Sequence, residues 1–282
     1  MRIAVVGHVE HVTLGHVVGV PRAGEIVHLT GPRILAGGGG AIAFHQLVRS
    51  DAELHLFTAL GDGEAGTFVE RELARTGANV HAARREEPHT RVLVMISPGG
   101  ERTIVVVGQP QQPTLADALP WETFARCDAV YFTAQDPELL RATRQARVLV
   151  VAARRREAIA RAGVRADVVV GSAADAREAS RRADFDTLTV PGALILTEGP
   201  SGGTIATAAG ETRFATPRRA HDAPLRGSGT YGAGDSFAGA LTYYFAAGYP
   251  IDDACARAAA HGAAVIGGSC PIDVQAALDA GR

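Results

Sequence analysis

GSGTYGAGDSFAGAL, residues 227–241, is a glycine-rich turn that leads directly into an amphipathic helix. Small residues let a ligand approach the backbone, and the first amides of a helix are unpaired donors at the positive end of its dipole. The turn therefore predicts an anion site, suited to a phosphate or to the charge on a transferring phosphoryl group. Asp235 lies at its edge, either as a base for an attacking hydroxyl or simply as a helix N-terminal acid.

Strands and helices alternate before this turn, and two helices follow it. Positions 237, 241, 244 and 245 put apolar side chains on one face of a helix over 233–247, and a second helix covers 251–265. The predicted strands upstream are 129–133, 147–152, 167–171 and 193–198, and the predicted helices between them are 136–145, 155–162 and 173–182. This alternation predicts a mostly parallel sheet covered by helices.

The N-terminal third is richer in strands. Apolar runs at 2–7 and 53–60 predict buried strands, and the spacing over 64–76 predicts a helix that stops at Gly77. Residues 92–96 and 103–107 flank a Ser-Pro-Gly-Gly turn, which predicts a hairpin. This hairpin is the best candidate for a small lid over a site.

Composition excludes several classes of function. The chain has 282 residues and a formal net charge of −2, so it offers no basic field for nucleic acid. All 28 basic residues are arginine, which excludes every mechanism that needs a catalytic lysine. Three scattered cysteines exclude a disulfide framework, and no run reaches the roughly 18 apolar residues of a membrane span. We expect a cytoplasmic protein.

The order of motifs along the chain resembles the ribokinase-like (PfkB) family of carbohydrate and nucleoside kinases. Residues Gly232 to Phe237 (GAGDSF) are similar to the C-terminal signature of that family. Other similar segments, in chain order, are Val5-Val6-Gly7, Pro21 to Glu25 (PRAGE), Ala36 to Ala41 (AGGGGA), Ala59 to Gly63 (ALGDG) with Gly66, Gly99 to Arg102 (GGER), and Leu196 to Gly199 (LTEG) with Gly203. Agreement of so many ordered motifs by chance is improbable.

The resemblance implies a three-layer α/β/α ribokinase-like domain over residues 1–282, with a small β-sheet lid from about 8–35 and 88–108. It also implies transfer of the γ-phosphoryl group of ATP to a hydroxyl of a small polar acceptor. The family works with Mg²⁺ and is often helped by K⁺. A homodimer through the lid is a further expectation.

Site residues carry over from the family by motif. Asp235 is expected to be the base, and the amides of Gly232, Ala233 and Gly234 the anion hole. The residues expected at the nucleotide are Thr197, Gly199, Gly203 and Thr230; those expected at the acceptor are Gly37, Gly38 and Gly39.

The acceptor motif departs from the family pattern. The Asp that commonly holds sugar hydroxyls is Val12 here, and the Asn two residues before it is Glu10. Residues two apart on a strand share a face, so we expect Glu10 to replace the missing contact, with His8 or His11 as helpers. Arg102, in the hairpin, is a further candidate for an acceptor phosphate or carboxylate.

The magnesium and phosphate motif Asn-x-x-Glu appears only as Ser172 to Asp175, which leaves Asp175 as a weak metal candidate. An Asp usual before the signature threonine is Gly229. Such losses leave room for a non-catalytic ligand-binding member, although Asp235 is retained. A nucleoside kinase is the other alternative, but only 5% of residues are aromatic, which favours a sugar or sugar-like acceptor.

Three other patterns are better explained by ordinary structural positions than by a functional site. His8 and His11 point to opposite faces of a strand, which disfavours joint metal binding. Gly199 to Gly203 matches the G-x-S-x-G nucleophile motif, but a hairpin rather than a helix is predicted to follow. Arg154 to Arg156 are predicted to lie on a solvated helix face.

Overall fold

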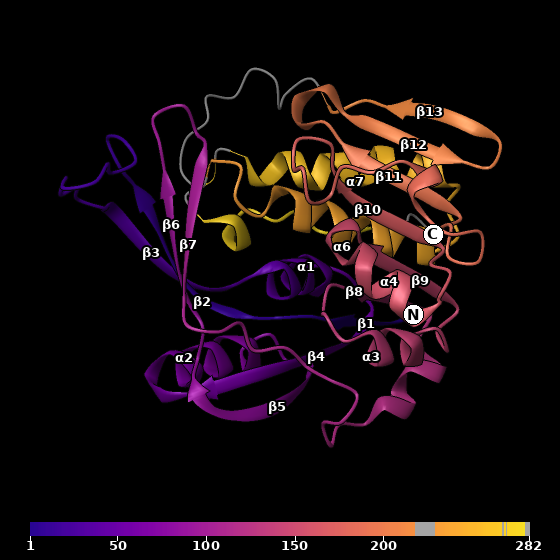
Figure 1. Cartoon of the computed structure of the whole chain (residues 1–282), viewed down its shortest axis with the longest axis horizontal. Coiled ribbons are helices and arrows are strands. Elements are labelled where there is room, and N and C mark those ends of the chain that lie inside the picture. Colours follow the sequence, from indigo (N-terminus) through magenta and orange to yellow (C-terminus); the bar gives the residue numbers. More distant parts are fainter. Residues whose placement is uncertain (218–228, 267, 269, 280–282) are drawn as a thin grey trace.

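The computed structural model describes residues 1–217, 229–266, 268 and 270–279, and these residues form two β-sheets. The larger sheet has nine strands in the order β13-β12-β11-β10-β9-β8-β1-β4-β5 (Figure 1). Its strands are β1 (Arg2–Val6), β4 (Glu53–Asp62), β5 (Asn79–Pro88), β8 (Ala129–Phe132), β9 (Val148–Ala152), β10 (Val168–Ser172), β11 (Ala193–Thr197), β12 (Gly203–Thr207) and β13 (Gly210–Phe214).

Most neighbours in this sheet run parallel, as predicted. The pairings from β11 across to β5 are parallel, whereas β11, β12 and β13 form antiparallel hairpins at one end. The carboxyl ends of parallel strands meet at one edge of a sheet, and this edge is where α/β folds bind ligands.

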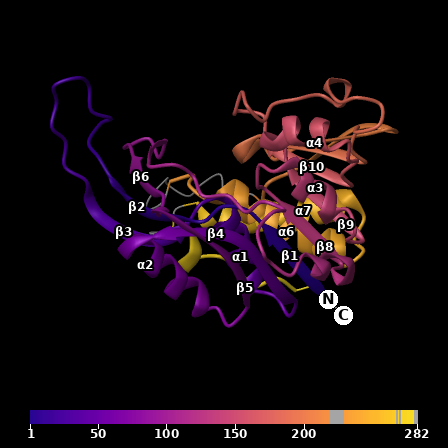
Figure 2. The same cartoon turned by 60° about the horizontal axis from the view of Figure 1, so that its bottom comes forward.

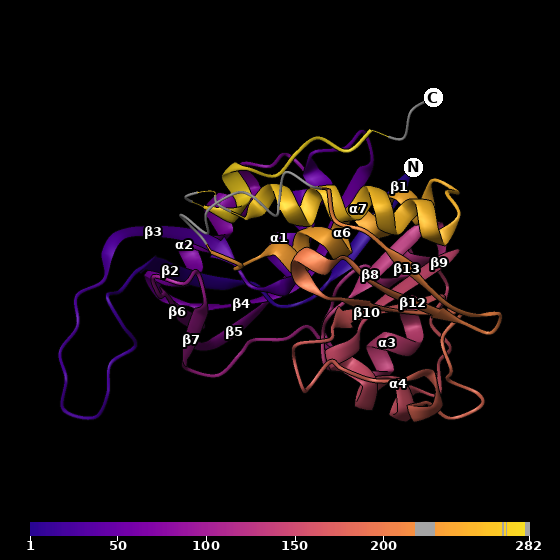
Figure 3. The same cartoon turned by 90° about the horizontal axis from the view of Figure 1, so that it is seen from above.

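Helices cover both faces of the nine-stranded sheet, and this confirms the predicted three-layer architecture (Figure 3). In β1, Ile3 and Val5 face one core while Ala4 and Val6 face the other, because alternate residues of a strand point to opposite sides. The first core takes α1 (Gly39–Val48), α2 (Gly63–Ala74), α6 (Ala233–Ala246) and α7 (Ile251–Val265); the second takes α3 (Pro137–Thr143), α4 (Arg156–Ala162) and a 3₁₀ segment (Trp121–Arg126).

The second sheet, which we call the lid sheet, has four strands in the order β3-β2-β6-β7. It stands beside the main body (Figure 2). Its inner face is apolar and packs around Tyr231, the residue before the N-cap of α6. The lid strands are β2 (Glu10–His16), β3 (Thr30–Gly37), β6 (Arg91–Ile96) and β7 (Arg102–Val107).

One predicted helix is wrong. Residues 173–181 form turns, followed by a single 3₁₀ turn at Arg182–Asp184. The side chain of Asp175 accepts the amide of Arg177 at 2.9 Å, a local bond that competes with helical pairing. Strand β5 was not predicted, because its polar outer half hides the strand pattern. No helix in the described part of the chain is long and apolar enough to span a membrane.

Candidate active site

The first turn of α6 presents free backbone amides. Gly232 is the N-cap residue with a φ of 82°, and the amide of Ser236 donates the first regular helical bond to its carbonyl at 2.9 Å. Among the described residues, the amides of Gly234 and Asp235 have no backbone acceptor. Such donors at the positive end of a helix dipole attract an anion. Gly227 and Ser228 of the predicted turn lie outside the described residues.

The carboxylate of Asp235 lies against the glycine pair that starts α1. A Cβ atom added to Gly39 would stand 3.1 Å from Asp235 Oδ1. The pKa of Asp235 is raised to about 6: burial and then the charge of Glu178 raise it, while the charges of Arg102 and Arg154 act in the opposite direction. A carboxylate with this pKa is ionised at neutral pH and is still well matched to accept a proton there.

His8 and Glu10 line the other side of the same glycines. A Cβ atom on Gly38 would stand 3.1 Å from His8 Cδ2 and 3.2 Å from a carboxylate oxygen of Glu10. The amide of Gly39 donates to His8 Nε2 at 3.4 Å, and that nitrogen is 3.7 Å from Glu10 Oε1. The structure therefore brings His8, Glu10 and Asp235 together around two residues that have no side chain.

Both polar groups beside the glycines have unusual protonation. Burial raises the pKa of Glu10 to about 7, and the charge of Asp235 contributes to the shift. The pKa of His8 is lowered to about 4, first by burial and then by the charges of Arg155 and Arg154. At neutral pH, His8 is thus uncharged and Glu10 is partly protonated, so both can donate as well as accept hydrogen bonds.

The tip of the lid sheet touches the loop before α6. Arg102 Nη1 donates to Thr230 Oγ1 at 2.9 Å. A Cβ atom on Gly229 would stand 2.4 Å from the carbonyl oxygen of Gly100, so the Asp expected there from the family pattern would not fit without a shift of the lid tip. Arg102 and Thr230, expected at the acceptor and the nucleotide respectively, are bonded to each other in this structure.

The structure explains one departure of the acceptor motif and corrects one proposed helper. Val12 is fully buried in the lid core beside Tyr231, where a carboxylate would have no solvent. His11 turns away from His8 and makes an edge contact with Phe68 of α2 at a centroid distance of 5.1 Å. His11 therefore does not assist at the glycine pair, and joint metal binding by the two histidines is excluded.

The predicted nucleotide loop connects β11 to β12. Thr197 and Gly203 are register partners in an antiparallel pair, and Gly199 begins a short 3₁₀ turn between them. Gly203 has its own structural reason, because a Cβ atom there would stand 2.4 Å from the carbonyl oxygen of Leu196. A strand follows Ser201 instead of a helix, which contradicts a nucleophile elbow.

Of the two acids beyond β10, Glu178 acts through its charge on Asp235, whereas Asp175 is not among the groups that shift the pKa of Asp235. Glu178 Oε2 accepts the amide of Ser172 at 2.9 Å, and its charge raises the pKa of Asp235. Asp175 is paired with Arg154 and caps its own turn through Arg177. Sequence analysis missed Glu178; the available signal was an acid six residues after the last residue of a parallel strand.

The arginines 154–156 do not share one solvated face as predicted. Arg154 pairs with Asp175 and with Glu178, whose Oε1 accepts from Nε at 3.0 Å. Arg155 is half-buried, and its Nε donates to the carbonyl of Thr133 at 2.7 Å. Arg154 and Arg156 are exposed, in agreement with the prediction. The turn between β9 and α4 directs the first two side chains toward opposite neighbouring strands.

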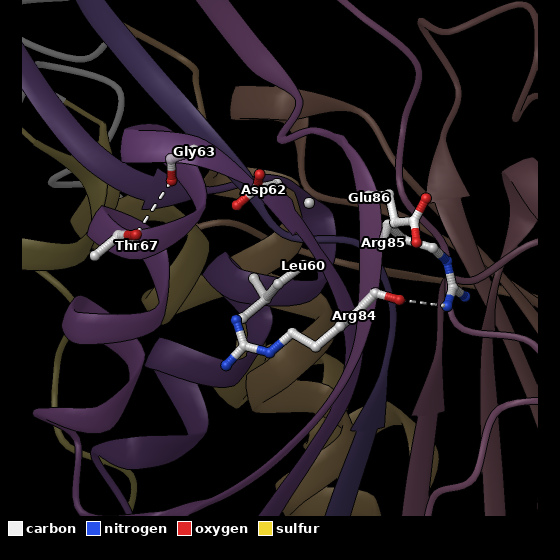
Figure 4. Close-up of a pocket in the computed structure, with 8 residues that line it drawn as sticks. Leu60, Asp62, Gly63, Thr67, Arg84, Arg85 and Glu86 are labelled. Atoms are coloured by element: carbon white, nitrogen blue, oxygen red, sulfur yellow. Dashed lines mark hydrogen bonds between the residues drawn. The ribbon is translucent and has the colours of Figure 1, made fainter.

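Two surface cavities lie elsewhere. One, of about 450 Å³, is lined by Asp62, Gly63 and Thr67 of the β4–α2 junction and by Arg84 and Arg85 of β5. Figure 4 shows the two arginine side chains diverging from the strand. Each has a carboxylate partner, Glu70 for the first and Asp117 for the second, so neither arginine of this cavity is an unpaired cation.

The family model for pfkB family carbohydrate kinases matches residues 1–275. The chain belongs to this PfkB family. Comparison with curated protein sequences gives no match.

Solved structures of PfkB-family kinases share the fold. A ribokinase from Giardia lamblia is 14% identical with a TM-score of 0.79, over 97% of this chain and 95% of that one. A ribokinase from Arabidopsis thaliana, complexed with ribose and ATP, is 16% identical with a TM-score of 0.75, over 99% and 96%. A nucleoside kinase from Methanocaldococcus jannaschii is 15% identical with a TM-score of 0.71, over 98% and 95%. These matches confirm the ribokinase-like fold.

Proposed function

We propose that this PfkB-family chain transfers the γ-phosphoryl group of ATP to a hydroxyl of a sugar or sugar-like acceptor. One observation carries the proposal: the Asp235 carboxylate lies between the free amides of α6 and the glycine pair at residues 38 and 39. A base and an anion hole then face the same small space, and in-line transfer needs both of them.

Asp235 takes the proton of the acceptor hydroxyl as that oxygen attacks phosphorus. Its raised pKa keeps it a competent proton acceptor near pH 7. The amides of Gly234 and Asp235, with Gly232 and Ala233 shaping the turn, stabilise the charge on the transferring group. This mechanism uses no lysine, in agreement with the composition.

The nucleotide lies along the β11–β12 turn in this proposal, with Thr197, Gly199, Gly203 and Thr230 beside it. The described residues include no group of three His, Cys, Asp or Glu side chains that could hold a metal ion alone. Mg²⁺ often binds through one or two carboxylates, waters and substrate phosphates, and Glu178 fits that role better than Asp175. Bound there, Mg²⁺ would neutralise phosphate charge. K⁺ activation remains a prediction.

The acceptor lies over Gly37, Gly38 and Gly39, within reach of Glu10, with Arg102 at the lid tip. The nucleoside alternative needs a stacking surface for a base. Tyr231, the aromatic residue at this point, is buried in the lid core, and its hydroxyl accepts the amide of Gly38 at 3.3 Å. The geometry therefore favours a sugar over a nucleoside.

The test is an ATP-consumption assay with Mg²⁺, with and without K⁺, across sugars, sugar acids, sugar phosphates, polyols and nucleosides. Asp235→Asn should lower turnover about 10²- to 10⁴-fold, the range for loss of a general base. Nucleotide binding, measured by calorimetry with a non-hydrolysable ATP analogue, should survive in the variant. Full activity of Asp235→Asn would contradict the mechanism, and ligand binding without turnover would favour the non-catalytic alternative.

A further inference from the structure

Arg155 is a half-buried guanidinium without an ion-pair partner among the described residues. Its Nε is held by the carbonyl of Thr133 at 2.7 Å, which fixes the stem of the side chain and leaves the terminal nitrogens uncommitted. Burial lowers the pKa of Arg155, because desolvation disfavours the charged form, and the charge of Glu178 acts in the opposite direction without reversing the shift. A partly desolvated cation costs free energy unless an anion accompanies it.

The two neighbouring arginines face different halves of the site. Arg154 turns toward β10, where Asp175 and Glu178 neutralise it. Arg155 turns toward Thr133, which directly follows β8. In the sheet, β10 is next to β11 and the nucleotide loop, whereas β8 is next to β1 and therefore to the segment that carries His8 and Glu10. Arg155 consequently belongs to the acceptor half.

Thr133 connects Arg155 to the reacting centre. A Cβ atom on Gly39 would stand 3.6 Å from both Thr133 Oγ1 and His8 Cε1, and 3.1 Å from Asp235 Oδ1. The charge of Arg155 also contributes to the lowered pKa of His8, so it acts across the same space. An acceptor placed over Gly39 would thus reach Asp235 on one side and Thr133, to which Arg155 is bonded, on another.

His8 supplies a second donor nearby. Its Nε2 accepts the amide of Gly39, so the proton of the neutral ring is on Nδ1, and Nδ1 is buried without a partner in the described part of the chain. Of the two cations whose charges lower the pKa of Asp235, Arg154 is paired with Asp175 and Glu178, and Arg102 donates to the neutral hydroxyl of Thr230 at the lid tip. Arg155 is a further cation without a carboxylate partner among the described residues, and it lies on the Thr133 side of Gly39.

We propose that Arg155 binds an anionic oxygen group of the acceptor, so that the acceptor is a sugar acid or a sugar phosphate. This inference rests on the proposed kinase function and narrows its substrate class. The acceptor's anion offsets the charge of Arg155, while its reacting hydroxyl lies at Asp235.

The test compares matched acceptors that differ by one charge: D-glucose with D-gluconate, and D-ribose with D-ribose 5-phosphate, at saturating Mg-ATP. We expect the anionic member of at least one pair to have a kcat/KM about 10- to 100-fold higher, the range for one hydrogen bond to a charged group. The gluconate and phosphate arms separate a carboxylate from a phosphoryl ligand.

Arg155→Gln should raise the KM for the preferred anionic acceptor about 10- to 100-fold and change the KM for ATP less than about threefold. Arg156→Gln removes an exposed guanidinium one residue away and should leave both constants unchanged. A rise in the KM for ATP alone would assign Arg155 to the nucleotide phosphates and overturn the proposal.

Preference for the neutral member of both pairs, with turnover that still needs Asp235, would overturn this inference and leave the kinase proposal intact. If no pair is turned over, the same compounds are titrated into protein saturated with Mg²⁺ and a non-hydrolysable ATP analogue. Failure of both anions to bind there would also overturn the inference. Failure of the nucleotide itself to bind would instead contradict the kinase function.

Discussion

Glu10 is a carboxyl group whose charge the fold disfavours. Its pKa is raised to about 7 in the folded chain from an ordinary value of 4.5. Between these values the folded state holds a proton that the unfolded state releases, so stability falls as the pH rises through this window. Glu10→Gln removes the titrating group and therefore the loss of stability at high pH. It should be more stable than the wild type at pH 8 by about 1–3 kcal/mol, with a smaller difference near pH 5.

Calorimetric unfolding of the two proteins at both pH values measures this difference. Glu157→Gln, on the exposed face of α4, is the matched control and should show no pH-dependent gain. Equal destabilisation of Glu10→Gln at pH 5 and pH 8 would show that Glu10 contributes hydrogen bonds rather than a disfavoured charge.

Arg102 acts on the protonation of Asp235 as well as on the lid. Its positive charge lowers the pKa of Asp235. Arg102→Gln should therefore raise that pKa and move the acidic limb of the kcat/KM profile to higher pH, whereas Arg102→Lys should keep the limb close to that of the wild type. The profile must be measured with the acceptor below its KM. If the acidic limb of Arg102→Gln stays at the wild-type pH, the guanidinium lies too far from Asp235 to affect its pKa.

At the scale of elements, α1 begins with glycine because a neighbouring side chain lies close to its backbone, and not because glycine favours a helix. Alanine at Gly39 would favour the helix by up to about 1 kcal/mol, but its Cβ would crowd Asp235 Oδ1 at 3.1 Å and occupy acceptor space. Gly39→Ala should thus unfold at the same or a higher temperature and yet lose at least about tenfold in kcat/KM, roughly 1.4 kcal/mol of transition-state binding. Equal loss of stability and activity would indicate a folding defect instead.

The sequence predicts best those elements whose apolar residues repeat with a regular period. The two C-terminal helices match α6 and α7 because their apolar faces repeat without interruption. The predicted helix at 173–182 is wrong because Asp175 bonds to its local backbone and to a distant arginine. Glu178 has one local signal, its position six residues after a parallel strand, whereas the bond from Arg155 to Thr133, which follows another strand, leaves no local pattern.

At the scale of the whole molecule, the lid sheet has an outer face that nothing in the described chain covers. Ile34, Thr13, Leu93 and Val105 form a row across its four strands, and Ile34 and Val105 are 54% and 44% exposed. Removing such a row from contact with water is favourable, at about 25 cal/mol per Å² of apolar surface buried. We therefore expect two chains to pair through their lids.

Light scattering coupled to size-exclusion chromatography should give twice the 29.3 kDa chain mass for the wild type at micromolar concentration. Val105→Glu, which places a charge in the centre of the row, should give the single-chain mass with an unchanged far-UV spectrum. Arg75→Glu changes charge on the exposed end of α2, away from the row, and should remain dimeric. A single-chain mass for the wild type would mean that the outer lid face stays open, and that each site is built by one chain alone.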